Sequence, residues 1–232
     1  MHESKIEQLT AYLSGFVSAP RRRRIEQVLA ERTRWIALVL EDIYQPHNSS
    51  AVLRSCECFG VQDVHIIENS NEYNPSPQVD MGSSGWLTLH RYDEGIDNTE
   101  LAIAVLRERG YKLVATTPHR DDCLLEDLAV DQPLALLFGT EDTGLSERAL
   151  AASDAFVRIP MYGFTESLNI SVSAALMLRE LTRKMRVENR AWQLSGNEEA
   201  ELRLQWYRGS IRGVELIEER YWTEQGRAED GV

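Results

Sequence analysis

Hydrophobic positions follow two different spacings along this chain. Near the N-terminus Ile6, Leu9, Leu13 and Phe16 recur at helical spacing, which predicts an amphipathic helix over residues 5–16. A proline ends this helix, and a second helix of similar pattern follows it. The chain is therefore predicted to begin with helices rather than with a strand.

From residue 35 onward short apolar runs are separated by amphipathic segments. The first run, Trp35–Ile43, has the length and hydrophobicity of a parallel strand that is buried on both faces. Strands are predicted over 35–43, 61–67, 112–117, 134–139 and 155–159, and helices over 101–109, 146–152 and 169–186. Strands that alternate with helices predict an α/β architecture around a mostly parallel sheet.

Two regions depart from this alternation. Residues 68–85 are rich in Asn, Ser, Pro and Gly, which predicts a long loop. After residue 189 the apolar spacing is helical again, over 198–207 and 214–222. We therefore predict an α/β domain over 35–190, flanked by helical extensions at 1–34 and 191–232.

The net charge of −12 argues against a nucleic-acid partner, but the distribution of charge changes this expectation. Residues 1–34 carry seven Lys or Arg and four Asp or Glu, a net of +3, which leaves −15 for the rest. The first basic cluster is Arg21, Arg22, Arg23 and Arg24, and the second is Arg179, Arg183, Lys184, Arg186 and Arg190. Each cluster is either a solvated helix face or a surface that follows RNA phosphates.

Cysteine, histidine and hydropathy patterns indicate the compartment and the cofactor chemistry. Cys56, Cys58 and Cys123 lack CxxC spacing and are typical of reduced thiols in the cytoplasm. The sequence shows no apolar leader and no run near the roughly 20 residues of a membrane span. The five histidines include no pair at metal-ligand spacing. We therefore expect a cytoplasmic protein without a metal ion or a membrane partner.

The first of three segments with candidate chemistry is Pro46-His47-Asn48-Ser49-Ser50-Ala51-Val52-Leu53-Arg54. It follows a predicted strand and begins a helix, for which Asn48 or Ser49 is the expected N-cap. The free N–H groups of such a helix can bind phosphate, and Arg54 can add a bidentate clamp. The alternative is a capped helix with a surface salt bridge.

The second segment joins a buried strand to a capped helix through a loop with two glycines, Gly139 and Gly144. It is neither a Walker A loop nor a GxGxxG motif. The acidic pair Glu141 and Asp142 would repel a phosphate, so a neutral or cationic ligand is expected, such as an adenosine that carries a sulfonium. The alternative is an ordinary strand-to-helix turn.

The third segment runs from a strand through Pro160 and Gly163 to a helix with small residues in its first turns. Ser167 and Asn169 precede that helix. Both are common N-cap residues, so a purely structural role is the alternative to a functional one.

Together the three segments resemble the motifs of the SpoU/TrmH family of RNA ribose 2′-O-methyltransferases, within the SPOUT superfamily. The resemblance covers residues 35–186 and includes Gly82-Ser83-x-x-Trp86 in the long loop. The form Pro-His-Asn-x-Ser-Ala-x-x-Arg of the first segment is similar to the branch that methylates guanosine-18 in the D-loop of tRNA.

This resemblance implies a C-terminal trefoil knot, a homodimer, a tRNA substrate and the cofactor S-adenosylmethionine. The cofactor site would comprise Thr116, Gly139, Glu141, Gly144, Ile159, Met161 and Leu168. The catalytic residues would be Arg54, Asn48, Glu141, Ser167 and Asn169, and RNA would be bound by Arg21, Arg22, Arg23, Arg24 and Arg54. Arg54 would activate the ribose 2′-hydroxyl with support from Asn48. Because a guanidinium is protonated at neutral pH, a clamp on phosphate and alkoxide is the alternative role.

Three other functions are weighed against this one. Methylation of ribosomal RNA is disfavoured because only about 34 helical residues precede the first strand, whereas the rRNA enzymes often carry an additional α/β domain there. A non-catalytic RNA-binding protein is disfavoured because the motif residues are intact. An unrelated nucleotide-binding protein is disfavoured by the absence of phosphate-loop motifs.

Overall fold

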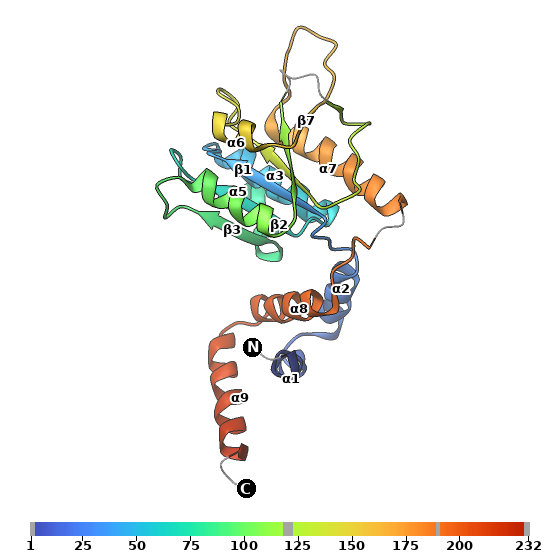
Figure 1. Cartoon of the computed structure of the whole chain (residues 1–232). Helices are drawn as coiled ribbons and strands as arrows, with labels where there is room; N and C mark the ends of the chain where they lie inside the picture. Colours follow the sequence, from blue (N-terminus) through green and yellow to red (C-terminus); the bar gives the residue numbers. More distant parts are fainter. Residues whose placement is uncertain (1–2, 118–122, 189–190, 230–232) are drawn as a thin grey trace. The chain divides into compact units, whose positions relative to one another are not determined.

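The computed structural model describes residues 3–117, 123–188 and 191–229 (Figure 1). These residues form two compact units. The larger unit is Thr33–Trp192, and the smaller unit combines the residues up to Arg32 with those from Gln193 onward. None of the described helices is long and apolar enough to cross a membrane.

The larger unit is built on a seven-stranded sheet in the order β3-β2-β1-β6-β4-β7-β5. Every neighbouring pair of strands is parallel, as the α/β pattern of the sequence predicts. The strands are β1 (Ile36–Glu41), β2 (Asp63–Ile67), β3 (Thr88–Tyr92), β4 (Lys112–Thr116), β5 (Cys123–Leu124), β6 (Leu134–Phe138) and β7 (Ala155–Arg158). The sequence pattern missed β3 and β5, because β3 carries polar residues at the sheet edge and β5 has two residues.

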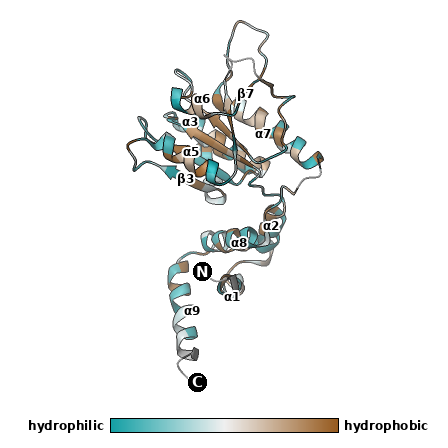
Figure 2. Ribbon diagram, in the orientation of Figure 1, coloured by the Kyte–Doolittle hydropathy of each residue, from teal (hydrophilic) through white to brown (hydrophobic). Residues whose placement is uncertain are grey.

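Helices cover both faces of this sheet. Alternate strand residues divide the buried side chains into two hydrophobic clusters, as side-chain alternation requires. The packed pair α3 (Pro46–Phe59) and α7 (Ile170–Val187) contributes to one cluster, and α5 (Asn98–Glu108) and α6 (Glu147–Ala152) contribute to the other. Figure 2 shows hydrophobic residues on the central strands and polar residues on the outward helix surfaces.

The region predicted as one long loop, residues 68–85, contains two short helical segments. These are α4 (Pro77–Asp80) and the 3₁₀ helix η1 (Ser83–Trp86). The carboxylate Oδ1 of Asp42, directly after β1, accepts hydrogen bonds from the backbone N–H groups of Asn69 and Ser70, at 2.7 and 2.8 Å. The beginning of the region is therefore attached to the end of the neighbouring strand.

The smaller unit consists of helices from both ends of the chain. They are α1 (Glu3–Ser14), α2 (Ala19–Leu29), α8 (Gly196–Ser210) and α9 (Val214–Glu229). Both N-terminal helices pack against α8, and Leu9, Leu13 and Trp206 are almost fully buried. Arg203 forms an ion pair with Glu26 at 2.8 Å. Helical spacing predicts these elements but not that the two ends of the chain pack together.

Candidate functional site: a cavity at the carboxyl ends of the strands

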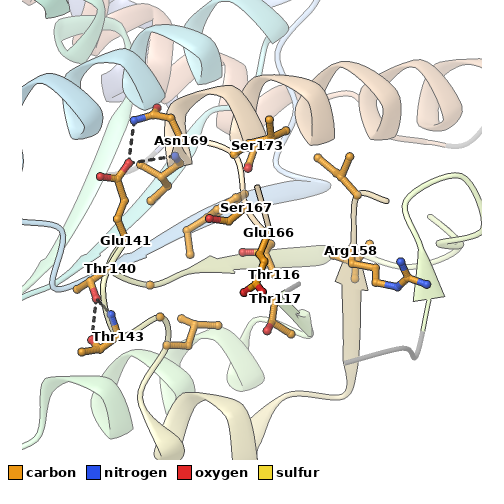
Figure 3. A pocket seen from close by; sticks show the side chains of 18 of the residues that line it. Thr116, Thr117, Thr140, Glu141, Thr143, Arg158, Glu166, Ser167, Asn169 and Ser173 are labelled. Carbon is orange, nitrogen blue, oxygen red and sulfur yellow. Dashed lines mark hydrogen bonds between the residues drawn. The ribbon is translucent and has the colours of Figure 1, made fainter. Parts of the chain in front are cut away.

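A cavity lies at the carboxyl ends of β4, β6 and β7, and the second and third of the segments identified in the sequence line it (Figure 3). Its volume is about 490 Å³. This value lies within the ~300–1,000 Å³ of typical ligand and cofactor sites. In parallel sheets, loops at the carboxyl ends of the strands commonly bind ligands, so the position of the cavity fits a binding site.

All residues that the sequence assigned to the cofactor line this cavity. They are Thr116, Gly139, Glu141, Gly144, Ile159, Met161 and Leu168. Thr116 ends β4, and its hydroxyl donates a hydrogen bond to the Leu137 carbonyl at 2.8 Å. Strands β4 and β6 are thus joined directly below the cavity.

The loop after β6 has a conformation that requires glycine. The N–H groups of Thr140 and Gly144 bond to each other's carbonyls, at 3.1 and 3.0 Å. A Cβ atom on Gly139 would lie 2.1 Å from the carbonyl carbon of Gly144, so no larger residue fits there. Gly144 has a φ of 71°, in the left-handed region that glycine adopts readily. The two glycines bring the backbone to the cavity wall.

A chain of polar side chains lies at one side of the cavity. The amide nitrogen of Asn169 donates to the Glu141 Oε1 at 2.7 Å (Figure 3). It also donates to the Asn48 Oδ1 at 3.0 Å. Asn48 and Asn169 are 121 positions apart in sequence. The fold therefore places one residue from each of the three segments in a single hydrogen-bonded group.

The remaining predicted catalytic residues lie apart from this group. Ser167 lines the cavity. Arg54 does not line it: its guanidinium is exposed on α3 and donates to the Met81 sulfur at 3.2 Å. Asn48, which is 8% exposed, also lies outside the cavity lining. The structure thus brings Asn48 to the cavity residues by hydrogen bonding but leaves Arg54 on the surface of α3.

The N-cap expected for the first segment is wrong. Helix α3 begins at Pro46 with Gln45 as its N-cap, so Asn48 and Ser49 lie in the first turn. Proline is favoured at the first helical position because its missing N–H would have no partner there. In the third segment Asn169 is the N-cap of α7 and accepts from the Ser171 N–H at 2.9 Å.

The two basic clusters differ in how their side chains are used. Arg21, Arg23 and Arg24 are exposed on α2, whereas the half-buried Arg22 donates to the Ser14 carbonyl at 3.0 Å.

In the second cluster Lys184 donates to the backbone carbonyls of Leu125 and Leu128, at 3.3 and 3.1 Å. Arg186 lies over the Trp192 ring at 4.9 Å. Arg190 lies outside the described residues. Lys184 and Arg186 therefore have structural contacts.

Sequence reasoning missed Glu41, a buried carboxylate at the end of β1. Its Oε1 accepts from the hydroxyls of Thr99 and Ser146, at 2.6 and 2.8 Å, and its Oε2 accepts from the Ser146 N–H at 2.8 Å. Ser146 is the N-cap of α6, two residues after Gly144. Glu41 therefore anchors the cavity loop to the central strand. Glu41 is an acidic residue within an apolar run of the sequence, and this unusual position could have indicated its role.

No metal centre is found in the part of the chain that the structure describes. Among those residues no group of three or more His, Cys, Asp and Glu could hold an ion. Two loops and a helix N-terminus instead supply backbone groups, carboxylates and apolar side chains to the cavity.

An all-parallel α/β sheet whose cavity is lined by residues at and after the ends of β4, β6 and β7 defines the class of protein. Residues 36–179 match the model of the SpoU rRNA Methylase family, and the chain belongs to this family. The tRNA (guanosine(18)-2′-O)-methyltransferase of Borreliella burgdorferi is 41% identical over 206 residues, which is 89% of this chain and 93% of that protein.

Solved structures show the same fold. The A. aeolicus TrmH/SpoU tRNA modifying enzyme has a TM-score of 0.74 and 24% identity, and the match covers 83% of this chain and 98% of that one. The SpoU methyltransferase AviRb from Streptomyces viridochromogenes, solved in complex with AdoMet, has a TM-score of 0.57 and 26% identity, with 71% and 62% covered.

Proposed function

We propose that this chain is an S-adenosylmethionine-dependent methyltransferase that acts on the ribose 2′-hydroxyl of guanosine-18 in tRNA. The observation that carries the proposal is the cavity with its hydrogen-bonded Asn48, Asn169 and Glu141, one residue from each segment. The relative from Borreliella burgdorferi is a tRNA methyltransferase, and its alignment covers 89% of this chain, more than the sheet unit alone. This similarity supports tRNA rather than ribosomal RNA as the substrate.

The residues present fit the cofactor. Glu141, Asp142 and Glu166 line the cavity and complement a sulfonium and an ammonium group, while Arg158 complements a carboxylate. Apolar residues, among them Leu145, Ile159, Met161 and Leu168, offer a surface for the adenine ring. We assign cofactor binding to the seven residues predicted from the sequence, of which Gly139 and Gly144 bring the backbone close to the ligand.

The chemistry is a substitution in which the carbon–sulfur bond breaks as the bond from the ribose oxygen to the methyl carbon forms. S-adenosylmethionine supplies the electrophilic methyl group when it is bound. The protein must hold the two reactants in line and assist loss of the hydroxyl proton. Asn169 holds Glu141 and Asn48 at the cavity, so these side chains orient the reacting groups.

For Arg54 we propose the role of an electrostatic clamp. The guanidinium is exposed and presents its N–H donors and its positive charge to the solvent. A cation in this position can bind an RNA phosphate and stabilise negative charge on the ribose oxygen. Its planar fork, which lysine lacks, suits bidentate binding of phosphate.

We assign tRNA binding outside the cavity to the arginines of α2. Arg21, Arg23 and Arg24 are adjacent and exposed, and α2 contains no acidic residue in its first turn. Lysines and arginines that contact phosphates supply most non-specific affinity for nucleic acid. A cytoplasmic location is part of the proposal because tRNA is the substrate.

A homodimer is also part of the proposal. Val172 and Leu176 on α7 are each 45% exposed and lie four residues apart, on one side of the helix. A second copy would cover this apolar pair. Sedimentation should give the mass of a dimer for the wild type and a mass closer to that of a monomer for Leu176→Glu. A monomeric wild type would contradict the proposed homodimer.

The trefoil knot is supported by contacts of the segment between β4 and β6. Leu125, Leu128 and Val130 share a core cluster with α7, and Lys184 of α7 bonds to carbonyls of the same segment. Joining the chain ends covalently should keep the denatured chain more compact than a cyclised unknotted chain of equal length, and equal compactness of the two would contradict the knot.

The activity is tested by mass spectrometry of tRNA after incubation with S-adenosylmethionine. We expect a single methyl group on the ribose of guanosine-18. Arg54→Lys should lose most of this activity and retain cofactor binding measured by calorimetry, because the cavity lining is unchanged. Methylation at another ribose, or of ribosomal RNA instead, would overturn the substrate assignment. Cofactor binding without methylation of any RNA would support the non-catalytic alternative.

A further inference from the structure

Two aromatic side chains project from the loop between β7 and α7. Figure 1 shows this segment, in orange at the top of the view, extending away from the sheet. Its ends line the cavity through Met161 and Glu166, whereas the residues between them do not. Within that stretch Tyr162 is 95% exposed and Phe164 is 108% exposed.

No packing within the described chain accounts for these aromatic residues. The other exposed aromatic side chains, Phe16, Tyr44 and Trp222, are between 37% and 50% exposed. Leaving apolar surface in water costs about 25 cal/mol per Å² compared with burying it. Two exposed aromatic side chains separated by one residue therefore indicate a surface that a ligand or partner covers.

The position of the rings relative to the cavity limits what that partner can be. Tyr162 is one residue from Met161, and Phe164 is two residues from Glu166, so both lie within about 7 Å of chain from the cavity lining. A ribose that receives a methyl group from the cavity must carry its base within one nucleotide of the same rim. A nucleobase thus reaches the loop whenever the reacting ribose is in place.

Charge distinguishes the base from the phosphate backbone as the partner of this loop. Tyr162, Gly163, Phe164 and Thr165 carry no charge, and Glu166 follows them. The cavity lining sets the carboxylates of Glu141, Asp142 and Glu166 against one cation, Arg158, so its charge balance disfavours phosphate. A flat and uncharged nucleobase is the part of RNA that suits this surface, because aromatic side chains stack on unstacked bases in single-stranded and loop RNA.

We propose that Tyr162 and Phe164 form a stacking platform for the base of the methylated nucleotide or of its immediate neighbour. The inference rests on the proposed function, since it requires that RNA present a ribose at the cavity. It makes the two rings specificity-determining residues: they bind an extruded base and thereby hold the ribose oxygen at the cavity.

The test compares alanine and aromatic substitutions at both positions. Tyr162→Ala and Phe164→Ala should each raise the Kd for tRNA, whereas Tyr162→Phe and Phe164→Tyr should retain it. Stacking of one base is worth about 1–3 kcal/mol, which corresponds to roughly 5- to 150-fold in Kd. Calorimetry should give the same affinity for S-adenosylmethionine in all variants. Ile96→Ala, which removes an equally exposed apolar side chain on another loop, is the matched control and should leave tRNA binding unchanged.

Stacking is measured by the fluorescence of 2-aminopurine, a base analogue that replaces the nucleotide next to position 18 of the tRNA. Its fluorescence should be quenched by the wild type and by the aromatic variants, but not by the double alanine variant. An unchanged Kd in the double variant would overturn the proposal. So would loss of binding accompanied by a change from dimer to monomer in sedimentation, since the loop would then be an interface between copies. Failure of the proposed function appears separately, as a wild type that does not methylate guanosine-18.

Discussion

Asn169 shows how one side chain can serve both the fold and the site. Its Oδ1 caps α7 by accepting from the Ser171 N–H, and its Nδ2 donates to Asn48 and to Glu141. The sequence left open whether this residue is only a helix cap or also a functional group. In the structure the oxygen of the amide caps the helix, while its nitrogen joins Asn48 to Glu141 beside the cavity.

Replacing Asn169 by Asp separates these two roles. The cap should survive, because Asp is as good an N-cap as Asn, while the donor to Glu141 is replaced by a second carboxylate. We expect the melting temperature to change little and kcat to fall by at least tenfold. Asn169→Ser, which retains a cap oxygen without the added charge, is the comparison. Full activity in the Asp variant would show that the amide donor is dispensable.

Glu41 acts on the cavity without lining it. Glu41→Gln replaces one carboxylate oxygen by an amide that cannot accept from Ser146 or Thr99, so one buried donor loses its partner. The expected cost is about 1–3 kcal/mol of stability. Because the lost bond anchors the loop of Gly139 and Gly144, the KM for S-adenosylmethionine should rise several-fold while the KM for tRNA stays constant.

The control for Glu41 is a buried carboxylate at the other end of the strands. Asp63 begins β2 and bonds to His90 at 2.8 Å, far along the strand direction from the cavity. Asp63→Asn should lower stability and leave the KM for S-adenosylmethionine unchanged. An equal rise of this KM in both variants would show that Glu41 contributes general stability and does not position the loop.

At the scale of elements, β2 and β3 share a polar network within the sheet. His65 on β2 is fully buried, its Nδ1 lies 2.8 Å from the Tyr92 hydroxyl, and its ring stacks on His90 at 4.4 Å. Burial, followed by the nearby charge of His90, lowers the pKa of His65 from 6.5 to about 3. The imidazole is thus neutral in the folded protein at any pH above this value.

This depressed pKa makes the folded protein sensitive to acid. Between about pH 6.5 and 3 the unfolded chain binds a proton at His65 that the folded chain does not, so stability falls as the pH falls. Above about pH 6.5 neither state binds this proton, so His65 causes no loss of stability there. His65→Gln should reduce the slope of unfolding free energy against pH by up to about 1.4 kcal/mol per pH unit in this window. Denaturant titrations at pH 7, 6 and 5 would measure it, and equal slopes for both proteins would contradict the assignment.

At the scale of the whole molecule, the distribution of charge matters more than its sum. A net charge of −12 would repel tRNA, yet a run of four arginines lies on α2. Removing this segment by truncation would also remove α1 and its buried Leu9 and Leu13, so folding and RNA binding would be lost together. Substitution of single side chains avoids this.

The double variant Arg23→Gln and Arg24→Gln tests the arginines of α2. We expect weaker tRNA binding and a plot of log K against log salt that is less steep by about 1–2, as expected for up to two lost phosphate contacts. Arg212→Gln with Arg220→Gln changes the charge equally in the same helical unit and at exposed positions. If the two double variants behave alike, binding depends on net charge and α2 is not a specific contact.

The sequence by itself determined the local elements and the residue types of the site. Apolar runs such as Ile36–Leu40 predict buried strands, and the glycines of the second segment indicate a backbone that can approach a ligand closely. The strands and helices depend on short-range patterns, namely hydrophobic spacing, capping and turns, which a sequence records directly. The resemblance of its motifs to a known family implied seven cofactor-binding residues, and these seven line one cavity.

Tertiary structure alone decided what is brought together over long distances. It joined Asn48 to Asn169, attached the cavity loop to Glu41, packed both ends of the chain into one helical unit and left Arg54 on the surface of α3. It also buried His65 of β2 beside His90 and Tyr92 of the edge strand β3. These contacts depend on the order of the strands and on packing between distant segments, which no local pattern specifies.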